Sequence, residues 1–312
     1  MRNLRIVYMG TPEFAVPGLK LLVENGYNIV AVITAPDKPQ GRGLKLGETP
    51  VKEYAKSVGL PILQPEKLKN EDFLAELKAL RADLQIVVAF RMLPELVWNM
   101  PPMGTFNLHA SLLPQYRGAA PINWAIINGE TETGVTTFFL KHEIDTGDLI
   151  LQEKEPILEN DTVDSLYERL MNRGAALILK TVQLIENDGV VPIAQVQTAE
   201  LKHAPKIFKE NCKIDWHWSA AQIKNFVRGL SPYPTAFCHI NGMYCKIYKA
   251  EYHRDATTHP ILQPFNFEVR NKKTLVVGTG DGEIIIEDLQ LEGKKRMDIG
   301  AFLMGNEVKS IS

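Results

Sequence analysis

Two polar side chains near the middle of the chain, Asn107 and His109, have the spacing and chemistry of a reaction centre. They stand two residues apart in a segment, residues 104–108, that is typical of a short strand entering a loop. On a strand, residues two apart point to the same face, so the amide and the imidazole project together while Phe106 and Leu108 pack on the opposite side. An amide donor beside an imidazole suits a carbonyl oxygen that becomes an anion during a reaction. The pair therefore predicts chemistry at a carbonyl group.

An acid to partner this pair is available between residues 141 and 148. Two apolar runs flank this polar stretch, and functional residues favour such a loop on a rigid scaffold. The stretch contains Glu143, Asp145 and Asp148, and spacing alone does not choose among the three.

The turn Gly10-Thr11-Pro12 follows the first predicted strand and opens a helix. Free backbone N–H groups at such a turn could bind an anion. The turn lacks the G-x-G-x-x-G spacing, and no acidic residue is placed to hold a ribose, so a dinucleotide site is poorly supported. An ordinary tight turn explains the segment at least as well.

Residues 36–47 form a predicted long loop with three cations, Lys38, Arg42 and Lys45, against the single anion Asp37. Its three glycines permit unusual backbone angles. A solvated flexible loop would explain the segment. The alternative is an arm that contacts phosphates, in which Arg42 would make the bidentate contact.

Composition limits the broad class of protein. The chain has 312 residues, 45% hydrophobic and 23% charged, which is ordinary for a soluble globular protein of two domains. Three cysteines are too few for a disulfide framework or a zinc site, and no apolar run approaches the roughly 20 residues of a membrane span. A cytosolic protein without a membrane segment is expected. The net charge is −2, yet residues 206–312 contain 15 Lys and Arg against 12 Asp and Glu, which suggests an anionic partner for the C-terminal third.

The pattern of elements predicts an α/β domain and a β domain. Strands at 5–9, 29–34, 61–63 and 84–89 alternate with helices, which indicates a mostly parallel, Rossmann-like sheet in a catalytic domain over residues 1–188. Residues 189–205 have no helical periodicity and read as a linker. Residues 206–312 contain one helix and several short runs of period two, which predict a small, OB-like β-barrel.

The stretch from Phe106 to Ile122, which includes Ser-Leu-Leu-Pro after the histidine, resembles the signature of the folate-dependent formyltransferases. The string Ile-Asp-Thr-Gly at 144–147 matches the acidic loop of that family and selects Asp145. The resemblance implies that Asn107, His109 and Asp145 are catalytic and that Gly10, Thr11 and Pro12 lie on the acceptor side. It implies two further segments at the site of the formyl donor: Ser111, Leu112, Leu113 and Pro114, and Phe90, Arg91 and Met92.

The basic loop and the C-terminal third resemble those of the methionyl-tRNA formyltransferases, notably Gln222–Leu230, Pro232 and Gln290–Met297. This resemblance implies 10-formyltetrahydrofolate as co-substrate, initiator methionyl-tRNA as acceptor and partner, and Lys38, Arg42 and Lys45 as RNA contacts. No metal or permanently bound cofactor is expected, and a monomer is the default. Two alternatives stay open. A formyltransferase for a small amine would not need the basic loop or this C-terminal domain, and a tRNA-binding module would not need the catalytic trio.

Overall fold

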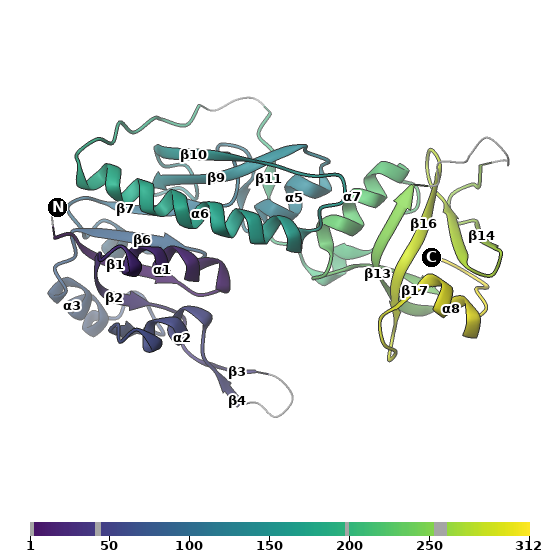
Figure 1. The fold of residues 1–312 in the computed structure, drawn as a ribbon, viewed down its shortest axis with the longest axis horizontal. Helices are drawn as coiled ribbons and strands as arrows, with labels where there is room; N and C mark the ends of the chain where they lie inside the picture. The colour runs from purple at the N-terminus through teal and green to yellow at the C-terminus, as the bar shows by residue number, and fades with distance from the viewer. Residues whose placement is uncertain (1–2, 41–44, 197–199, 253–260) are drawn as a thin grey trace. The chain divides into compact units, whose positions relative to one another are not determined.

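The computed structural model describes residues 3–40, 45–196, 200–252 and 261–312, and the chain forms two compact units (Figure 1). The first comprises Met1–Gly118, Thr133–Glu155 and Tyr167–Lys202; the second comprises Ala119–Glu132, Pro156–Leu166 and His203–Ser312. Two stretches that precede residue 203 in the sequence thus belong to the second unit by their contacts. In the part of the chain that the structure describes, no helix has the length and apolarity needed to cross a membrane.

A seven-stranded sheet organises the first unit, in the spatial order β10-β9-β7-β6-β1-β2-β5. Its strands are β1 (Arg5–Gly10), β2 (Asn28–Ile33), β5 (Ile62–Leu63), β6 (Leu84–Val88), β7 (Thr105–His109), β9 (Glu132–Phe139) and β10 (Leu149–Pro156). The five strands from β7 to β5 are parallel, and β9 joins β7 antiparallel. The expectation of a mostly parallel α/β sheet is therefore confirmed.

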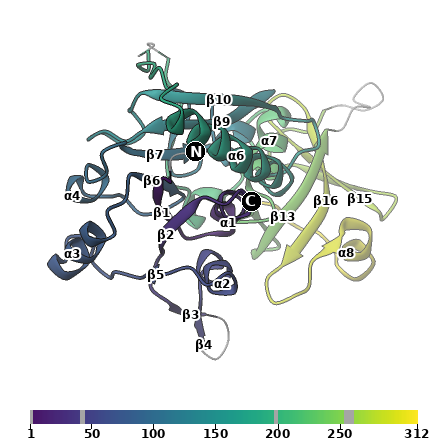
Figure 2. The same ribbon diagram turned by 60° about the vertical axis from the view of Figure 1, so that its left-hand side comes forward.

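Helices cover both faces of this sheet. They are α1 (Val16–Glu24), α2 (Pro50–Ser57), α3 (Glu71–Ala79), the short α4 (Glu95–Trp98) and the long α6 (Val163–Glu186). Figure 2 shows α1 and α6 on one side of the sheet and α3 and α4 on the other. Gly18 lets α1 approach α6 closely, because a Cβ there would lie 2.6 Å from Ile178. On the opposite face, Val7 and Met9 of β1 belong to one buried cluster with Phe73 of α3.

The predicted loop at residues 36–47 differs from the expectation at its two ends. Its ends pair as two short antiparallel strands, β3 (Lys38–Gln40) and β4 (Lys45–Gly47). Three residues are too few to show a period of two, and Pro39, which has no N–H to donate, masks the strand signal further. Arg42 lies outside the described residues.

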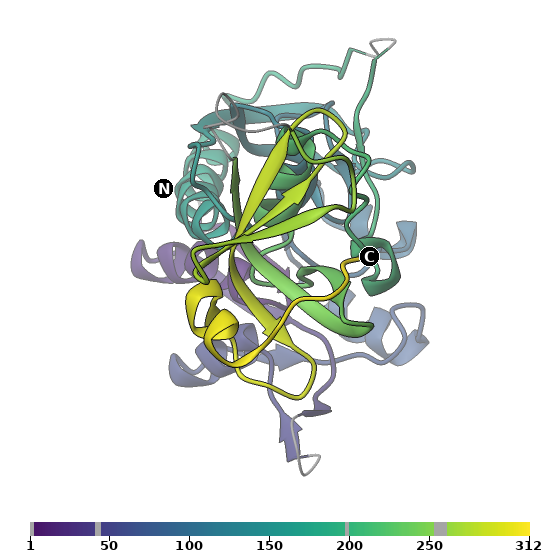
Figure 3. The same ribbon diagram turned by 90° about the vertical axis from the view of Figure 1, so that its right-hand side faces the viewer.

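The second unit is built around an antiparallel sheet in the order β12-β13-β16-β15-β14, with β17 beside β16 (Figure 3). Its elements are α5 (Pro121–Ile127), β11 (His203–Ala204), α7 (Ala220–Leu230), β12 (Ala236–Ile240), β13 (Met243–Tyr252), β14 (Phe267–Arg270), β15 (Thr274–Gly278), β16 (Glu283–Leu291), β17 (Met297–Asp298) and α8 (Ile299–Gly305). A C-terminal antiparallel β domain is confirmed, whereas closure into an OB-like barrel stays a prediction.

Helix α7 starts at a capping box, in which Ser219 and Gln222 each bond the other's backbone N–H. It packs on α5, where Asn123 donates to the Gly229 carbonyl at 2.9 Å. Gly229 is needed at this crossing, since a Cβ would lie 2.6 Å from Ile127. Trp216 is fully buried in the core of this unit.

Candidate active site

The carboxyl ends of three neighbouring parallel strands bring the predicted site segments to one edge of the sheet. Gly10 at the end of β1 is in register with Val88 of β6, which is in register with Leu108 of β7. The turn 10–12, the segment 90–92 and His109 all follow from these ends. Ligands of open α/β sheets bind in the crevice outside the carboxyl ends of the strands. The topology thus collects residues that lie about 100 positions apart in the sequence.

Asn107 and His109 project from the face of the sheet opposite α6. Leu108 points the other way, since a Cβ on Gly174 of α6 would lie 2.7 Å from its side chain. The face was correctly predicted from the period of two. Asn107 is half-buried, and its side-chain amide makes no hydrogen bond to any residue that the structure describes. An amide on a strand that has no hydrogen-bond partner among the described residues is available to a ligand.

Both ring nitrogens of His109 can be assigned from their neighbours. Nε2 lies 2.8 Å from the carbonyl oxygen of Tyr116. A carbonyl only accepts hydrogen bonds, so Nε2 carries a hydrogen and Nδ1 is the nitrogen that gains or loses the proton. Nδ1 faces Asp145, with 3.9 Å between it and Oδ2. That distance is too long for a hydrogen bond, but it makes an ion pair when the ring is protonated.

The structure distinguishes Asp145 from the other two acids of its loop. Its side chain is nearly buried, and Oδ2 also accepts a hydrogen bond from the Gly118 N–H at 3.0 Å. Asp148 instead pairs with Lys141 at 2.8 Å on a solvent-exposed part of the loop. Glu143 is exposed, and Thr146 bonds its backbone carbonyl rather than its carboxylate. Of the three acids, Asp145 is therefore the one whose carboxylate approaches His109.

The Ser-Leu-Leu-Pro loop divides into buried and accessible residues. Ser111 is fully buried and donates from Oγ to the Gln115 carbonyl at 2.6 Å; Leu113 is 3% exposed. Gln152 supports the loop by donating to the Leu113 carbonyl at 2.9 Å. Ser111 and Leu113 thus shape the loop from inside. Leu112 and Pro114 are half-buried, and the Leu112 side chain packs against Gly134 of β9.

After β6, Arg91 and Met92 are exposed, whereas Phe90 packs against a buried cluster of the first unit. Met92 is 72% exposed, and together with Arg91 it lines an open cavity of about 870 Å³. The guanidinium of Arg91 donates to the carbonyls of Glu66 (2.7 Å) and Pro65, and partial desolvation lowers the pKa of Arg91. Arg91 thereby fixes the course of the segment. Phe90 is half-buried and stacks under Arg91.

At the first strand-to-helix turn, two backbone N–H groups already have acceptors, so fewer donors are available to an anion than expected. The Phe14 N–H donates to the Tyr167 hydroxyl, and the Ala15 N–H donates to the Pro12 carbonyl. Gly10 is required sterically, because a Cβ would lie 2.6 Å from the Cβ of Ala15. The ordinary tight turn explains Gly10 fully, whereas Thr11 and Pro12 are half-buried at its edge.

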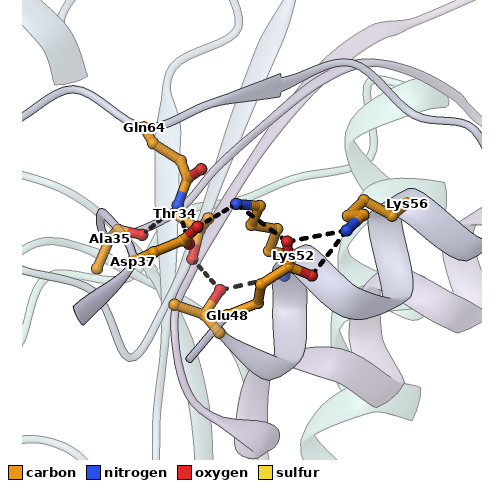
Figure 4. Close-up of polar contacts among 8 residues, drawn as sticks. Thr34, Ala35, Asp37, Glu48, Lys52, Lys56 and Gln64 are labelled. Carbon is orange, nitrogen blue, oxygen red and sulfur yellow. Dashed lines mark hydrogen bonds and ion pairs between the residues drawn. The ribbon is translucent and has the colours of Figure 1, made fainter. Parts of the chain in front are cut away.

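The base of the β3–β4 hairpin is fixed to α2 by charged side chains (Figure 4). Lys52 pairs with Asp37, just before β3, and lies 3.3 Å from Glu48, just after β4. Gln64 donates to Asp37 at 2.8 Å, and Lys56 donates to Glu48. Hydrogen bonds from Lys52 lower the pKa of Asp37, and those from Lys56 and Lys52 lower the pKa of Glu48. Lys38 is exposed, and Lys45 begins β4.

Two residues that support Asp145 were not found from the sequence. Gln195 lies in the predicted linker, donates to backbone carbonyls of the Asp145 loop, and accepts hydrogen bonds from Arg117. Nothing in the local pattern marks a glutamine in an irregular segment as a partner of a loop some 50 residues earlier.

Two family models together match most of the chain. Residues 4–182 match the formyl transferase family model, and residues 206–307 match that of the formyl transferase C-terminal domain. The chain is 56% identical over 313 residues to a methionyl-tRNA formyltransferase of Parabacteroides distasonis, covering 97% of this chain and 96% of the relative. It is 57% identical over 314 residues to that of Phocaeicola vulgatus, with the same coverage.

Solved structures share the fold at lower identity. An N-formyltransferase from Helicobacter canadensis, in complex with folinic acid and dTDP-3-aminofucose, has a TM-score of 0.66 and 23% identity over 91% of this chain and 98% of that one. A sugar 3N-formyltransferase, WlaRD, has a TM-score of 0.68 and 23% identity over 95% of this chain and 100% of that one. From the two family matches and the identity along nearly its whole length, the chain belongs to the formyl transferase family.

Proposed function

We propose that this chain is a cytoplasmic, monomeric methionyl-tRNA formyltransferase, which moves the formyl group of 10-formyltetrahydrofolate to the α-amino group of methionine on initiator tRNA. The observation that carries the chemistry is the approach of the Asp145 carboxylate to Nδ1 of His109, on the sheet face that also presents Asn107. The acceptor is supported by relatives that carry this name and are 50–57% identical over almost the full chain.

In the proposed mechanism the neutral amine attacks the formyl carbon, and negative charge develops on the formyl oxygen. The free amide of Asn107 donates a hydrogen bond to that oxygen, and protonated His109 adds positive charge beside it. The new C–N bond forms while the bond from the formyl carbon to N10 of the folate breaks. The proton lost by the amine passes to N10, and the Asp145 carboxylate can hold it on the way while His109 stays protonated. Binding both substrates in one cleft supplies the proximity.

The remaining assignments belong to the same proposal. Leu112 and Pro114 contact the formyl donor directly, Ser111 and Leu113 shape its loop, and Phe90, Arg91 and Met92 line the donor side. Gly10, Thr11 and Pro12 border the acceptor. Lys38, Arg42 and Lys45 of the basic hairpin meet RNA phosphates, and the C-terminal domain, residues 206–312, adds further RNA contacts. The exposure of Lys38 and the fixed hairpin base support this reading.

The test compares acceptors under one set of conditions. The protein is incubated with 10-formyltetrahydrofolate and, in parallel, charged initiator tRNA, uncharged tRNA, an aminosugar nucleotide or glycinamide ribonucleotide. Formylation of the charged tRNA at least about 100-fold faster than of either small amine is expected. Transfer to a small amine with none to charged tRNA would replace the proposal by a small-amine formyltransferase. Binding of tRNA without any transfer would leave only an RNA-binding module.

A further inference from the structure

The backbone of the Asp145 loop has an unusual conformation. Asp145 has a φ of +56°, in the left-handed region that non-glycine residues seldom occupy. Such a residue persists only where its surroundings over-determine it, and such residues cluster at functional sites. The conformation directs the Asp145 carboxylate to both Nδ1 of His109 and the N–H of Gly118.

Gln195 holds the backbone of this loop at two carbonyl groups. Its Nε2 donates to the carbonyl of Asp145 at 2.9 Å and to the carbonyl of Gly147 at 2.8 Å. Arg117 donates to Oε1 of Gln195 from Nε at 3.2 Å and from Nη2 at 2.5 Å. An arginine only donates, so Oε1 must face Arg117 and Nε2 must face the two carbonyls. The orientation of the amide is therefore set by its neighbours on both sides.

The segment that contains Gln195 is itself fixed to the sheet. Ile193 and Leu149 exchange two backbone hydrogen bonds, of 2.8 and 2.9 Å, beside the start of β10. This pairing places Gln195 next to the loop, within the same compact unit. The stretch predicted as a linker thus contributes a side chain to the surroundings of the candidate acid.

From these contacts we infer that Gln195 is a positioning residue for formyl transfer, which acts through Asp145 and is itself oriented by Arg117. The inference rests on the proposed function for its kinetic consequence, though not for the contacts. Loss of the two Nε2 donors lets the Asp145 peptide relax, so the carboxylate moves away from His109. A misplacement of about 1 Å can cost roughly 100-fold in rate. The transfer step should suffer while substrate affinity should not.

Two variants distinguish the effect of losing the N–H donors of Gln195 from the effects of changing its length or its charge. Gln195→Met keeps the length and removes both donors, and Gln195→Glu keeps the acceptor for Arg117 but cannot donate. Each should slow single-turnover transfer by about 10-fold to 100-fold, with the KM of each substrate within about threefold of the parent. Asn187→Ala is the matched control, because Asn187 also donates from an amide to a backbone carbonyl, at an exposed helix end.

A double-mutant cycle tests whether Gln195 acts through Asp145. If it does, Asp145→Asn with Gln195→Met should be no slower than Asp145→Asn alone. Hydrogen exchange gives a readout that does not need activity. The Gly118 amide, which donates to Asp145, should exchange at least about tenfold faster in Gln195→Met than in the parent. Its exchange rate should be unchanged in Asn187→Ala.

The outcomes are separable. Parental rates and parental Gly118 exchange in Gln195→Met would overturn the inference. Slow transfer in Gln195→Glu with normal transfer in Gln195→Met would also overturn it, because the added charge would then be the cause. Full additivity in the double variant would show that Gln195 does not act through Asp145. If the parent itself transfers formyl to no acceptor, the proposed function and the kinetic role fail together, while Gly118 exchange still decides whether Gln195 fixes the loop.

Discussion

Asn107 provides the sharpest test of the oxyanion site, because its removal should change the chemistry and little else. Its amide makes no hydrogen bond to any described residue, so Asn107→Ala removes no hydrogen bond between that amide and the described part of the chain. The neighbouring side chains Phe106 and Leu108, which are 0% and 4% exposed, stay packed on the other face. The free energy of unfolding should therefore change by less than about 1 kcal/mol.

The expected kinetic loss follows from the role proposed for the amide. Removing one donor to a developing oxyanion costs about 100-fold to 1,000-fold in rate, or about 2.7–4 kcal/mol. Single-turnover transfer to charged tRNA should fall by that amount in Asn107→Ala, with both substrate affinities within about threefold. Asn107→Asp should be at least as slow, since a carboxylate repels the oxyanion. Asn25→Ala, at an exposed helix end, is the control. An Asn107→Ala rate within threefold of the parent would refute the oxyanion role.

Three further outcomes are expected. Pro114→Ala should raise the apparent KM for the formyl donor about fivefold or more and leave that for charged tRNA nearly unchanged; the opposite pattern would mean that donor and acceptor sides are reversed. Gly147→Ala should lower the transfer rate at least about tenfold, because its Cβ would lie 1.6 Å from the Phe139 carbonyl and the Asp145 loop would shift; a parental rate would contradict this. The pKa of Asp37 is lowered chiefly by Lys52, so their pairing is complete above the ordinary pKa of about 4 and is lost as pH falls through the lowered value. Proteolysis of the hairpin should accordingly increase in that acid range, and Lys52→Met should show the increase already at neutral pH; hairpin cleavage that depends on neither change would refute the anchoring role.

The fold followed from the sequence where local patterns were strong. Alternation of apolar strands and helices predicted the parallel sheet, and the period of two correctly predicted that Asn107 and His109 share a face. The short strands at 38–40 and 45–47 were missed because Pro39 and their length obscure any period. Residues 119–132 and 156–166 belong to the second unit by their contacts. This assignment depends on packing between residues far apart in the sequence, which a linear pattern does not show.

The residue types of the candidate site could be predicted from the sequence, but the residues that hold its acidic loop in place could not. Motif resemblance selected Asp145 among three nearby acids, and the approach of its carboxylate to His109 agrees with that choice. Ser111 and Leu113 were expected at the formyl donor, yet their burial points to a role inside the loop. Gln195 escaped prediction because its amide donates to carbonyls of the backbone, which every residue possesses.

The central claim is that Asp145 acts with His109 in formyl transfer to methionyl-tRNA. Its most direct test is single-turnover formylation of charged initiator tRNA by the parent protein and by Asp145→Asn, with both substrates saturating. The parent should form N-formylmethionyl-tRNA, and Asp145→Asn should do so at least about 100-fold more slowly while binding both substrates as the parent does. A rate within threefold of the parent in Asp145→Asn would contradict the claim.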